Sequence, residues 1–119
     1  NHMENLDFIY EDILETNNKK KYDVIVMSNV LEHIDERVNF VKKIMILFSP
    51  KTILIRVPLF ERHWEVAMRK ELGINYFSDS THFIEHTREE FKKEMNDAGL
   101  RIDGIEIVWG EIWAKCTPQ

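Results

Sequence analysis

The stretch 21–34, KYDVIVMSNVLEHI, constrains the fold of this chain more than any other part of its sequence. Its VIVM segment is apolar without alternation, which is typical of a parallel strand buried on both faces. Ser28 and Asn29 then end the strand at the edge where an open α/β sheet holds its ligands. Because Glu32 and His33 follow directly, the sequence predicts a site with two proton-accepting groups at the carboxyl end of this strand.

A helix and a second strand are expected after this site. Asp35 is placed to cap the helix, whose apolar residues recur at the three- and four-residue spacing of a buried face. Ser49 and Pro50 end it, since proline cannot continue the hydrogen-bond ladder. The β-branched segment 52–57, closed by Pro58, predicts a second strand and completes a βαβ unit. The apolar helix positions are Val38, Val41, Ile44, Met45 and Phe48.

Two further helices are predicted in the second half of the chain. Residues 61–72 are expected to form a helix that stops at Gly73. Thr87 and Glu90 have the spacing of a capping box, in which each side chain satisfies a free backbone donor. Gly99 would supply the left-handed turn at the end of this second helix. The side chains expected to face the core from it are Phe91 and Met95.

The remaining apolar segments predict strands. Residues 6–10, LDFIY, are a short strand candidate before the central strand. Residues 102–109 and 111–116 flank Gly110 closely enough to form a hairpin. The predicted class is therefore α/β, with parallel strands first, a C-terminal antiparallel hairpin, and helices on the faces of the sheet.

Composition excludes several kinds of partner. With a formal charge of −5 and scattered lysines, the chain has no cationic surface for nucleic acid. No apolar run approaches the ~20 residues of a membrane span. The single cysteine, Cys116, excludes an internal disulfide and suits a reducing, cytoplasmic compartment. Residues 1–3 are expected to be a tag remnant, which leaves residues 4–119 as a single small domain.

Several of these segments resemble a known enzyme family. YDVIV at 22–26, running into NVLEHI at 29–34, resembles the fourth strand of S-adenosylmethionine-dependent methyltransferases with the Rossmann-like fold. The resemblance continues through Asp79-x-x-His82 to the helix end at 98–100. It covers nearly the whole chain but only the second half of the family's domain. The implied fold is a partial Rossmann-like methyltransferase sheet, truncated at its leading half.

The resemblance implies S-adenosylmethionine as cofactor and assigns residues to it. Asp12 resembles the position whose carboxylate accepts from the adenine amino group, with Ile13 beside it, although an aspartate there is usually a turn residue. Ser28, Asn29 and Val30 resemble the residues that line the sugar and methionine portion, although such a polar tip can equally begin a helix. The four glycines contain no G-x-G arrangement. Binding of the cofactor by this chain is therefore expected to be weak or absent.

The catalytic candidates are Glu32 and His33. An imidazole that titrates near neutrality can take a proton from an attacking hydroxyl, and the neighbouring carboxylate would support it. The alternative is that His33 packs under the following helix and is satisfied by backbone groups.

The acceptor-binding candidates lie farther along the chain. Arg56, Phe60 and Trp64 surround the end of the second strand, where the family builds its acceptor pocket. An arginine there could hold an anionic substrate, although an ordinary surface arginine is the simpler interpretation. His82 and His86 are assigned to the same pocket. Their four-residue spacing would suit a metal on a helix, but no cysteine or third histidine lies at a ligand spacing, so no metal is expected.

The missing strands predict an exposed sheet edge. The family places its first two strands beside the strand at 22–28, and without them that strand would expose a row of backbone donors and acceptors. Either residues 6–10 move in beside it, or a second copy of the chain docks there. A homo-oligomer, most simply a dimer, is expected through this edge.

Two function hypotheses follow. The first is a methyltransferase fragment that acts on a small-molecule or saccharide-like acceptor and is inactive alone. The second is a non-catalytic remnant that serves as an oligomerising or binding module. Another nucleotide-binding α/β domain is a weaker reading, because the two matching motifs would then be coincidences, and a two-histidine metal protein ranks last.

Overall fold

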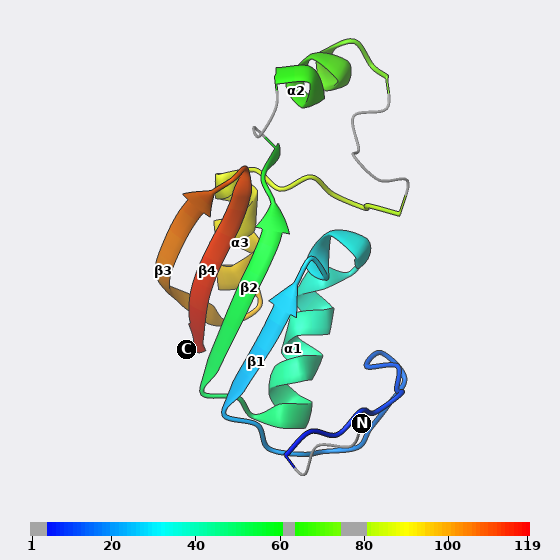
Figure 1. Cartoon of the computed structure of the whole chain (residues 1–119), viewed down its shortest axis with the longest axis vertical. Coiled ribbons are helices and arrows are strands. Elements are labelled where there is room, and N and C mark those ends of the chain that lie inside the picture. Colours follow the sequence, from blue (N-terminus) through cyan, green and yellow to red (C-terminus); the bar gives the residue numbers. More distant parts are fainter. Residues whose placement is uncertain (1–4, 61–63, 75–80) are drawn as a thin grey trace.

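The computed structural model describes residues 5–60, 64–74 and 81–119. Four strands form one sheet in the order β1-β2-β4-β3 (Figure 1). β1 (Val24–Ser28) and β2 (Thr52–Pro58) are parallel, and β4 is antiparallel to both of its neighbours. The predicted α/β class is confirmed. The other elements are η1 (Leu31–His33), α1 (Arg37–Phe48), α2 (Trp64–Glu71), α3 (Arg88–Asp97), β3 (Leu100–Val108) and β4 (Glu111–Pro118).

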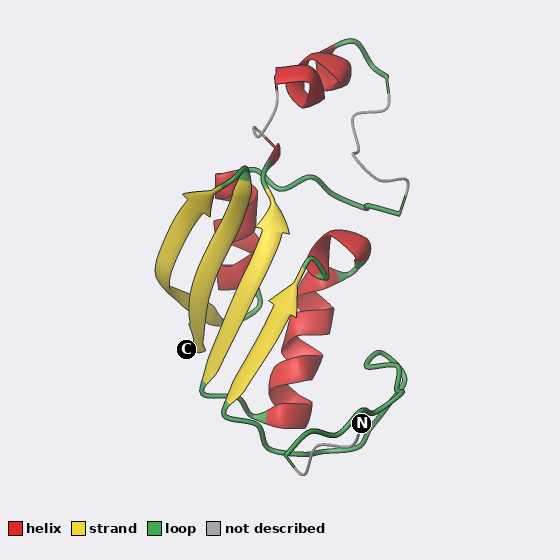
Figure 2. Cartoon of the chain, in the orientation of Figure 1, coloured by secondary structure: helices red, strands yellow, loops and turns green. Residues whose placement is uncertain are grey.

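The core lies between the sheet and two helices. α1 and α3 cover the same face of the sheet (Figure 2). Phe91 and Met95 of α3 are fully buried, as predicted, together with Ile53 of β2 and Ile112 of β4. Each such side chain contributes about 1.5 to 3 kcal/mol through burial, so this layer fixes the position of both helices against the strands.

α1 begins one residue later than predicted. Its N-cap residue is Glu36, not Asp35, and makes no side-chain cap hydrogen bond. The reason lies in the first helical residue, because Arg37 Nη1 donates to the Ile34 carbonyl at 2.9 Å and holds the connection from η1 in place. The helix ends as predicted, since Ser49 takes a left-handed conformation before proline.

α3 and the closing hairpin follow the sequence signals. The capping box of Thr87 and Glu90 is formed in both directions, and Gly99 has a φ of 85° at the helix end. The β3–β4 turn has positive φ at both central residues, 54° at Trp109 and 73° at Gly110. Such a pair is what a two-residue type I′ hairpin requires.

β1 differs from the predicted strand buried on both faces. Val24 and Val26 are 52% and 66% exposed, whereas Met27, on the opposite face, is buried. Met27 belongs to the same core cluster as Val41 and Ile44 of α1, and no described helix covers the other face of the sheet (Figure 2). An apolar run without alternation therefore reports strand propensity here, not burial on both faces. β1 also lies at the edge of the sheet, so the exposed edge expected from the missing strands is present in the described part of the chain.

Residues 6–10 do not form the predicted strand. Phe8 and Ile9 are largely exposed, and no described strand lies beside them to complete a ladder. The segment leads instead to a connection that runs along the end of α1, where the amides of Lys20 and Tyr22 donate to the carbonyls of Leu47 and Phe48.

α2 is shorter than the helix predicted over 61–72, of which residues 61–63 lie outside the described part. Gly73 follows it with a φ of 70°, as expected of a terminating glycine. Within the described ranges no helix has the length and apolar character needed to cross a bilayer.

Candidate functional site at the carboxyl end of β1

The chain turns sharply at the tip of β1. Ser28 ends the strand and is exposed, and Asn29 takes a left-handed φ of 55° while its amide donates to the Arg56 carbonyl at 2.9 Å. Asparagine tolerates this conformation better than most residues with a side chain. Its Oδ1 is buried and has no hydrogen-bond partner among the described residues. Val30 follows, half-buried against the core.

Glu32 is held inside the turn that follows. Its side chain is only 1% exposed, and neither carboxylate oxygen has a hydrogen-bond partner within the described part of the chain. Its backbone carbonyl accepts from the Phe83 amide at 2.7 Å. This bond brings the loop before α3 against η1, although the two segments are about fifty residues apart in sequence.

His33 lies at the boundary between this turn and solvent. Its side chain is 37% exposed, and its Nε2 lies 3.7 Å from Glu32 Oε1. Its Nδ1 is 2.8 Å from Thr81 Oγ1. The ring also meets the imidazole of His82 edge-on, with 4.6 Å between ring centroids. Neighbours on three sides therefore fix the orientation of His33, which is not the backbone-satisfied packing of the alternative interpretation.

His82 is held from the opposite side by a carboxylate. Its Nδ1 lies 2.9 Å from Glu85 Oε1, and the Glu85 side chain is fully buried. The loop thus places the His82 imidazole beside Glu32 and His33 of η1. Sequence spacing paired His82 with His86, but the structure pairs it with His33.

His86 has a different environment from His82. It is fully buried, its Nε2 lies 2.8 Å from Glu94 Oε2, and its ring packs edge-on against Phe91. The Phe60 amide donates to its carbonyl at 2.6 Å. These contacts anchor the loop to α3, and they point the imidazole into the core instead of an acceptor pocket.

Glu94 connects the loop anchor to α1. Arg37 reaches its Oε1 with Nε and Nη2, each at 2.7 Å, while His86 bonds its other oxygen. Burial would raise the pKa of this carboxyl, but the hydrogen bonds from His86 and Arg37 outweigh it and lower the pKa to about 2. Glu94 is therefore ionised throughout the ordinary pH range.

The other acceptor candidates are less concentrated. Arg56 Nε lies 3.1 Å from Glu111 Oε2 without hydrogen-bond geometry, and its guanidinium stands 5.2 Å above the Trp113 ring. Lys70 Nζ lies 5.1 Å from the centroid of the Phe60 ring. Trp64 is the first residue of α2, but its side chain lies outside the described residues, as does the whole of Asp79.

Asp12 and Ile13 are not brought to the tip of β1. The Asp12 carboxylate accepts from the Leu14 amide at 2.9 Å and closes a local turn, which is the ordinary role of such a residue. Ile13 packs against the core, and Lys43 of α1 donates to the Leu14 carbonyl. Figure 1 shows this N-terminal segment beside the end of α1 that is remote from η1.

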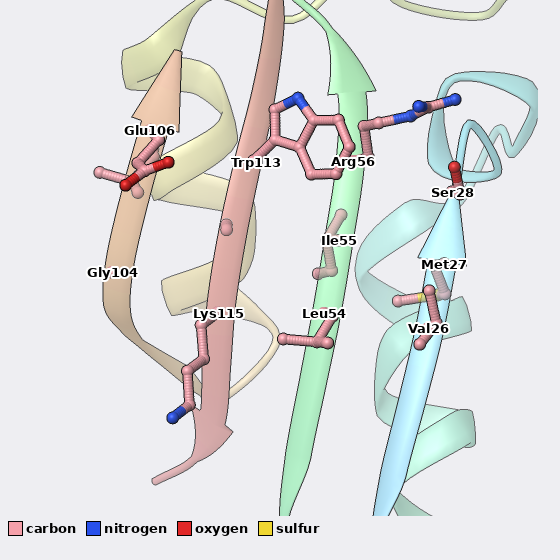
Figure 3. Close-up of a pocket in the computed structure, with 12 residues that line it drawn as sticks. Val26, Met27, Ser28, Leu54, Ile55, Arg56, Gly104, Glu106, Trp113 and Lys115 are labelled. Atoms are coloured by element: carbon pink, nitrogen blue, oxygen red, sulfur yellow. The ribbon is translucent and has the colours of Figure 1, made fainter. Parts of the chain in front are cut away.

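The uncovered face of the sheet carries an apolar groove of about 490 Å³. Figure 3 shows Val26, Leu54 and Trp113 on this face, with Arg56 and Lys115 toward its two ends. The groove lies across the strands and reaches Ser28 at the carboxyl end of β1, but none of Glu32, His33 and His82 lines it. It is therefore distinct from the cluster of Glu32, His33 and His82.

A family comparison identifies the fold. A family model described as a methyltransferase domain matches residues 2–104, most of the chain. The chain belongs to this methyltransferase family. The resemblance found in the 22–34 segment is confirmed, and β1 is the strand that carries it.

Solved structures agree with this fold. A small RNA methyltransferase, HEN1, is 20% identical, with a TM-score of 0.64 over 92% of this chain and 16% of that one. The magnesium protoporphyrin IX methyltransferase of Synechocystis PCC 6803, solved with bound SAH, is 16% identical, with a TM-score of 0.62 over 94% and 51%. A chain from the complex of the Haloferax volcanii Trm112 methyltransferase activator with a methyltransferase is 11% identical, with a TM-score of 0.74 over 99% and 64%.

At these identities the likeness concerns the fold alone. The chain spans less than two thirds of the length of each of these neighbours. No curated protein matches its sequence.

Sequence reasoning missed four residues that shape this candidate site. Thr81 and Glu85 each hold a histidine, and Arg37 and Glu94 join α1 to α3 across 57 positions of sequence. No local spacing marks a pair that far apart. The one available signal was that Glu32, His33 and His82 fall in segments already assigned to one end of the sheet.

Proposed function

We propose that this chain is the acceptor side of an S-adenosylmethionine-dependent methyltransferase that acts on a small-molecule or saccharide-like acceptor. The observation that carries the proposal is the position of Glu32 and His33, directly after β1 at the carboxyl edge of a sheet that belongs to a methyltransferase family. This edge is where open α/β sheets hold their ligands.

The chain's own residues suit proton handling beside an acceptor. Methyl transfer is an in-line displacement, so most of the rate comes from alignment, and a base is needed when the acceptor is a hydroxyl. Half-exposed His33 can take that proton, and the carboxylate 3.7 Å from its Nε2 stabilises the imidazolium that results. Thr81 fixes the ring from the other nitrogen.

The cofactor is matched only in part. S-adenosylmethionine would supply the activated methyl group. Ser28 and the unpartnered Oδ1 of Asn29 stand at the strand tip, where the resemblance places the cofactor. Asp12 lies elsewhere, and the sequence contains no glycine-rich turn. The described residues therefore do not form a complete cofactor site.

A calorimetric titration of S-adenosylmethionine into the chain tests this assignment. We expect a Kd weaker than about 10 μM, because the glycine-rich turn and its acidic partner supply most of the family's contacts. Tighter one-to-one binding would mean that these 119 residues form a full cofactor site, contrary to the assignment.

A second candidate function is an oligomerising module, favoured by the bare edge of β1. Its backbone groups on one side meet no described strand, and Val24 and Val26 add exposed apolar surface beside them. We assign this edge to a second copy of the chain, because two identical edges can pair antiparallel about a two-fold axis and satisfy each other's backbone groups.

The mass in solution tests the oligomer. By light scattering at micromolar concentration, we expect a dimer that Val26→Lys converts to a monomer, since a charged edge residue opposes strand pairing. Ile46→Lys is the matched control, because Ile46 is equally exposed but lies on α1, and it should leave the dimer intact. A monomeric parent chain would contradict the assignment.

A further inference from the structure

Three potential metal ligands from two distant segments converge beside the tip of β1. Glu32 and His33 come from η1, and His82 comes from the loop before α3. Their ligand atoms all lie within 4.8 Å of one another, and Glu32 Oε1 is 3.7 Å from His33 Nε2. Ligands on one zinc ion stand about 3.3 Å apart, a consequence of 2.0 to 2.1 Å bonds and tetrahedral angles. Modest side-chain rotations would close this difference.

The Glu32 carboxylate is the second, independent sign of a ligand. It is 1% exposed and aims into the cluster, and neither oxygen has a hydrogen-bond partner among the residues described. Burying a carboxylate without partners costs several kcal/mol. A cation bound between this group and the two imidazoles would remove that cost.

The two histidines are oriented in the way that metal ligands are. A ligating imidazole uses one nitrogen for the metal, while its other nitrogen bonds a carboxylate or another polar group. His82 Nδ1 meets the buried Glu85 carboxylate at 2.9 Å, and His33 Nδ1 meets Thr81 Oγ1 at 2.8 Å. Nε2 is thus the nitrogen that each ring would use as a ligand.

We propose that Glu32, His33 and His82 bind a divalent transition-metal ion of the Zn²⁺ type. Two imidazoles and one carboxylate suit zinc, cobalt, nickel or iron, whereas Mg²⁺ and Ca²⁺ take oxygen ligands almost exclusively. Three protein ligands leave a coordination position open. The sequence predicted no metal because it offered only the pair of His82 and His86, whereas the fold substitutes His33 and Glu32 for His86.

The metal would change how the acceptor is activated, an extension that rests on the proposed function. With Nε2 bound to the ion, His33 positions the metal instead of taking a proton. A hydroxyl in the open position would then ionise more easily, because a bound dication lowers its pKa. The metal site itself is independent of this extension and is tested by binding.

The experiment uses the whole chain, freed of metal with a chelator and titrated with ZnCl₂ by calorimetry and with CoCl₂ by visible absorption. We expect one ion per chain with a Kd below about 10 μM for Zn²⁺, a Co²⁺ spectrum of low coordination number, and no binding of Mg²⁺. His82→Ala and Glu32→Gln should each weaken Zn²⁺ binding by more than about 100-fold.

The controls separate ligation from folding. Glu32→Gln replaces the carboxylate with a neutral group of the same shape, so the metal-free variant should unfold at the same or a higher temperature than the parent. His2→Ala, which removes a histidine remote in sequence from all three ligands, should bind Zn²⁺ as the parent does.

The proposal is overturned by a parent chain without stoichiometric Zn²⁺ binding, by unchanged affinity in folded His82→Ala, or by a preference for Mg²⁺. S-adenosylmethionine is absent from every arm, so failure here leaves the methyltransferase assignment standing.

Discussion

At the scale of single residues, Glu94 links the two segments that carry the site. Its carboxylate pairs with Arg37 of α1 and with His86 of the loop before α3. Arg37 follows the segment that carries Glu32, and His86 lies in the loop that carries His82, so one carboxylate fixes both segments. Arg37 also bonds the Ile34 carbonyl directly after η1. The geometry of the histidine cluster therefore depends on an ion pair that lies beneath it.

The pH dependence of stability tests this role of Glu94. Its pKa is lowered from 4.5 to about 2 in the folded chain, so its contribution is complete above pH 4.5 and is lost as pH falls toward 2. Glu94→Gln should cost about 2 kcal/mol at neutral pH, with a difference from the parent that shrinks across that window. Urea unfolding of both proteins at several pH values measures it.

Glu89→Gln is the matched control for Glu94→Gln. Glu89 lies on the same helix with an 83% exposed side chain, and its removal should leave stability within about 0.5 kcal/mol of the parent. A difference between Glu94→Gln and the parent that stays constant down to pH 2 would contradict the ionised pair.

At the scale of elements, the β3–β4 hairpin carries a turn residue that its backbone does not favour. Trp109 has a φ of 54° and is 96% exposed, so its side chain has positive-φ strain without compensating burial. Asn-Gly is the preferred pair for such a turn. The hairpin is therefore held by its strands and not by its turn.

Trp109→Asn should stabilise the chain by about 0.5 to 1 kcal/mol, because asparagine accepts the left-handed conformation at lower cost. Gly110→Ala is the opposite test at the adjacent position, where φ is 73°, and should destabilise by about 1 kcal/mol. Both effects are read from urea unfolding midpoints. A loss of stability in Trp109→Asn would indicate that the exposed indole makes contacts that the turn depends on.

The elements also mark where sequence reasoning holds. β1, α1, β2, the capping box of α3 and the Gly110 turn were all predicted, because each is specified by neighbouring residues: an apolar run, a helical period, or a paired cap. The strand at 6–10 was not formed, since a strand also needs a partner ladder that its own sequence does not encode. The start of α1 was misplaced because a side chain from inside the helix organises the preceding backbone.

At the scale of the whole molecule, burial and long-range pairing were beyond prediction. The sequence of β1 is the same whether one or both of its faces are covered, so the exposure of Val24 and Val26 could be found only from the assembled sheet. The meeting of His33 with His82 depends likewise on a loop folding back across half the chain. The tip of β1 was predictable, but the group of side chains around it was not.

The exposed edge of β1 separates the two candidate functions, because a second copy of the chain and a further part of a methyltransferase sheet would compete for it. A methyltransferase sheet normally continues past this strand, and the chain spans less than two thirds of the length of its structural neighbours. We infer that the cofactor contacts absent here belong to the part of the sheet that would cover β1.

The most direct test is a calorimetric titration of S-adenosylmethionine into the full-length product of the gene, beside the same titration of the present chain. The account predicts one-to-one binding with a Kd below about 10 μM for the longer protein only. It also predicts a loss of about tenfold in that protein on Asn29→Gly, which keeps the left-handed backbone and removes the amide. Equal affinity in the two proteins, or no binding in either, would contradict the claim that this chain is the acceptor side of a methyltransferase.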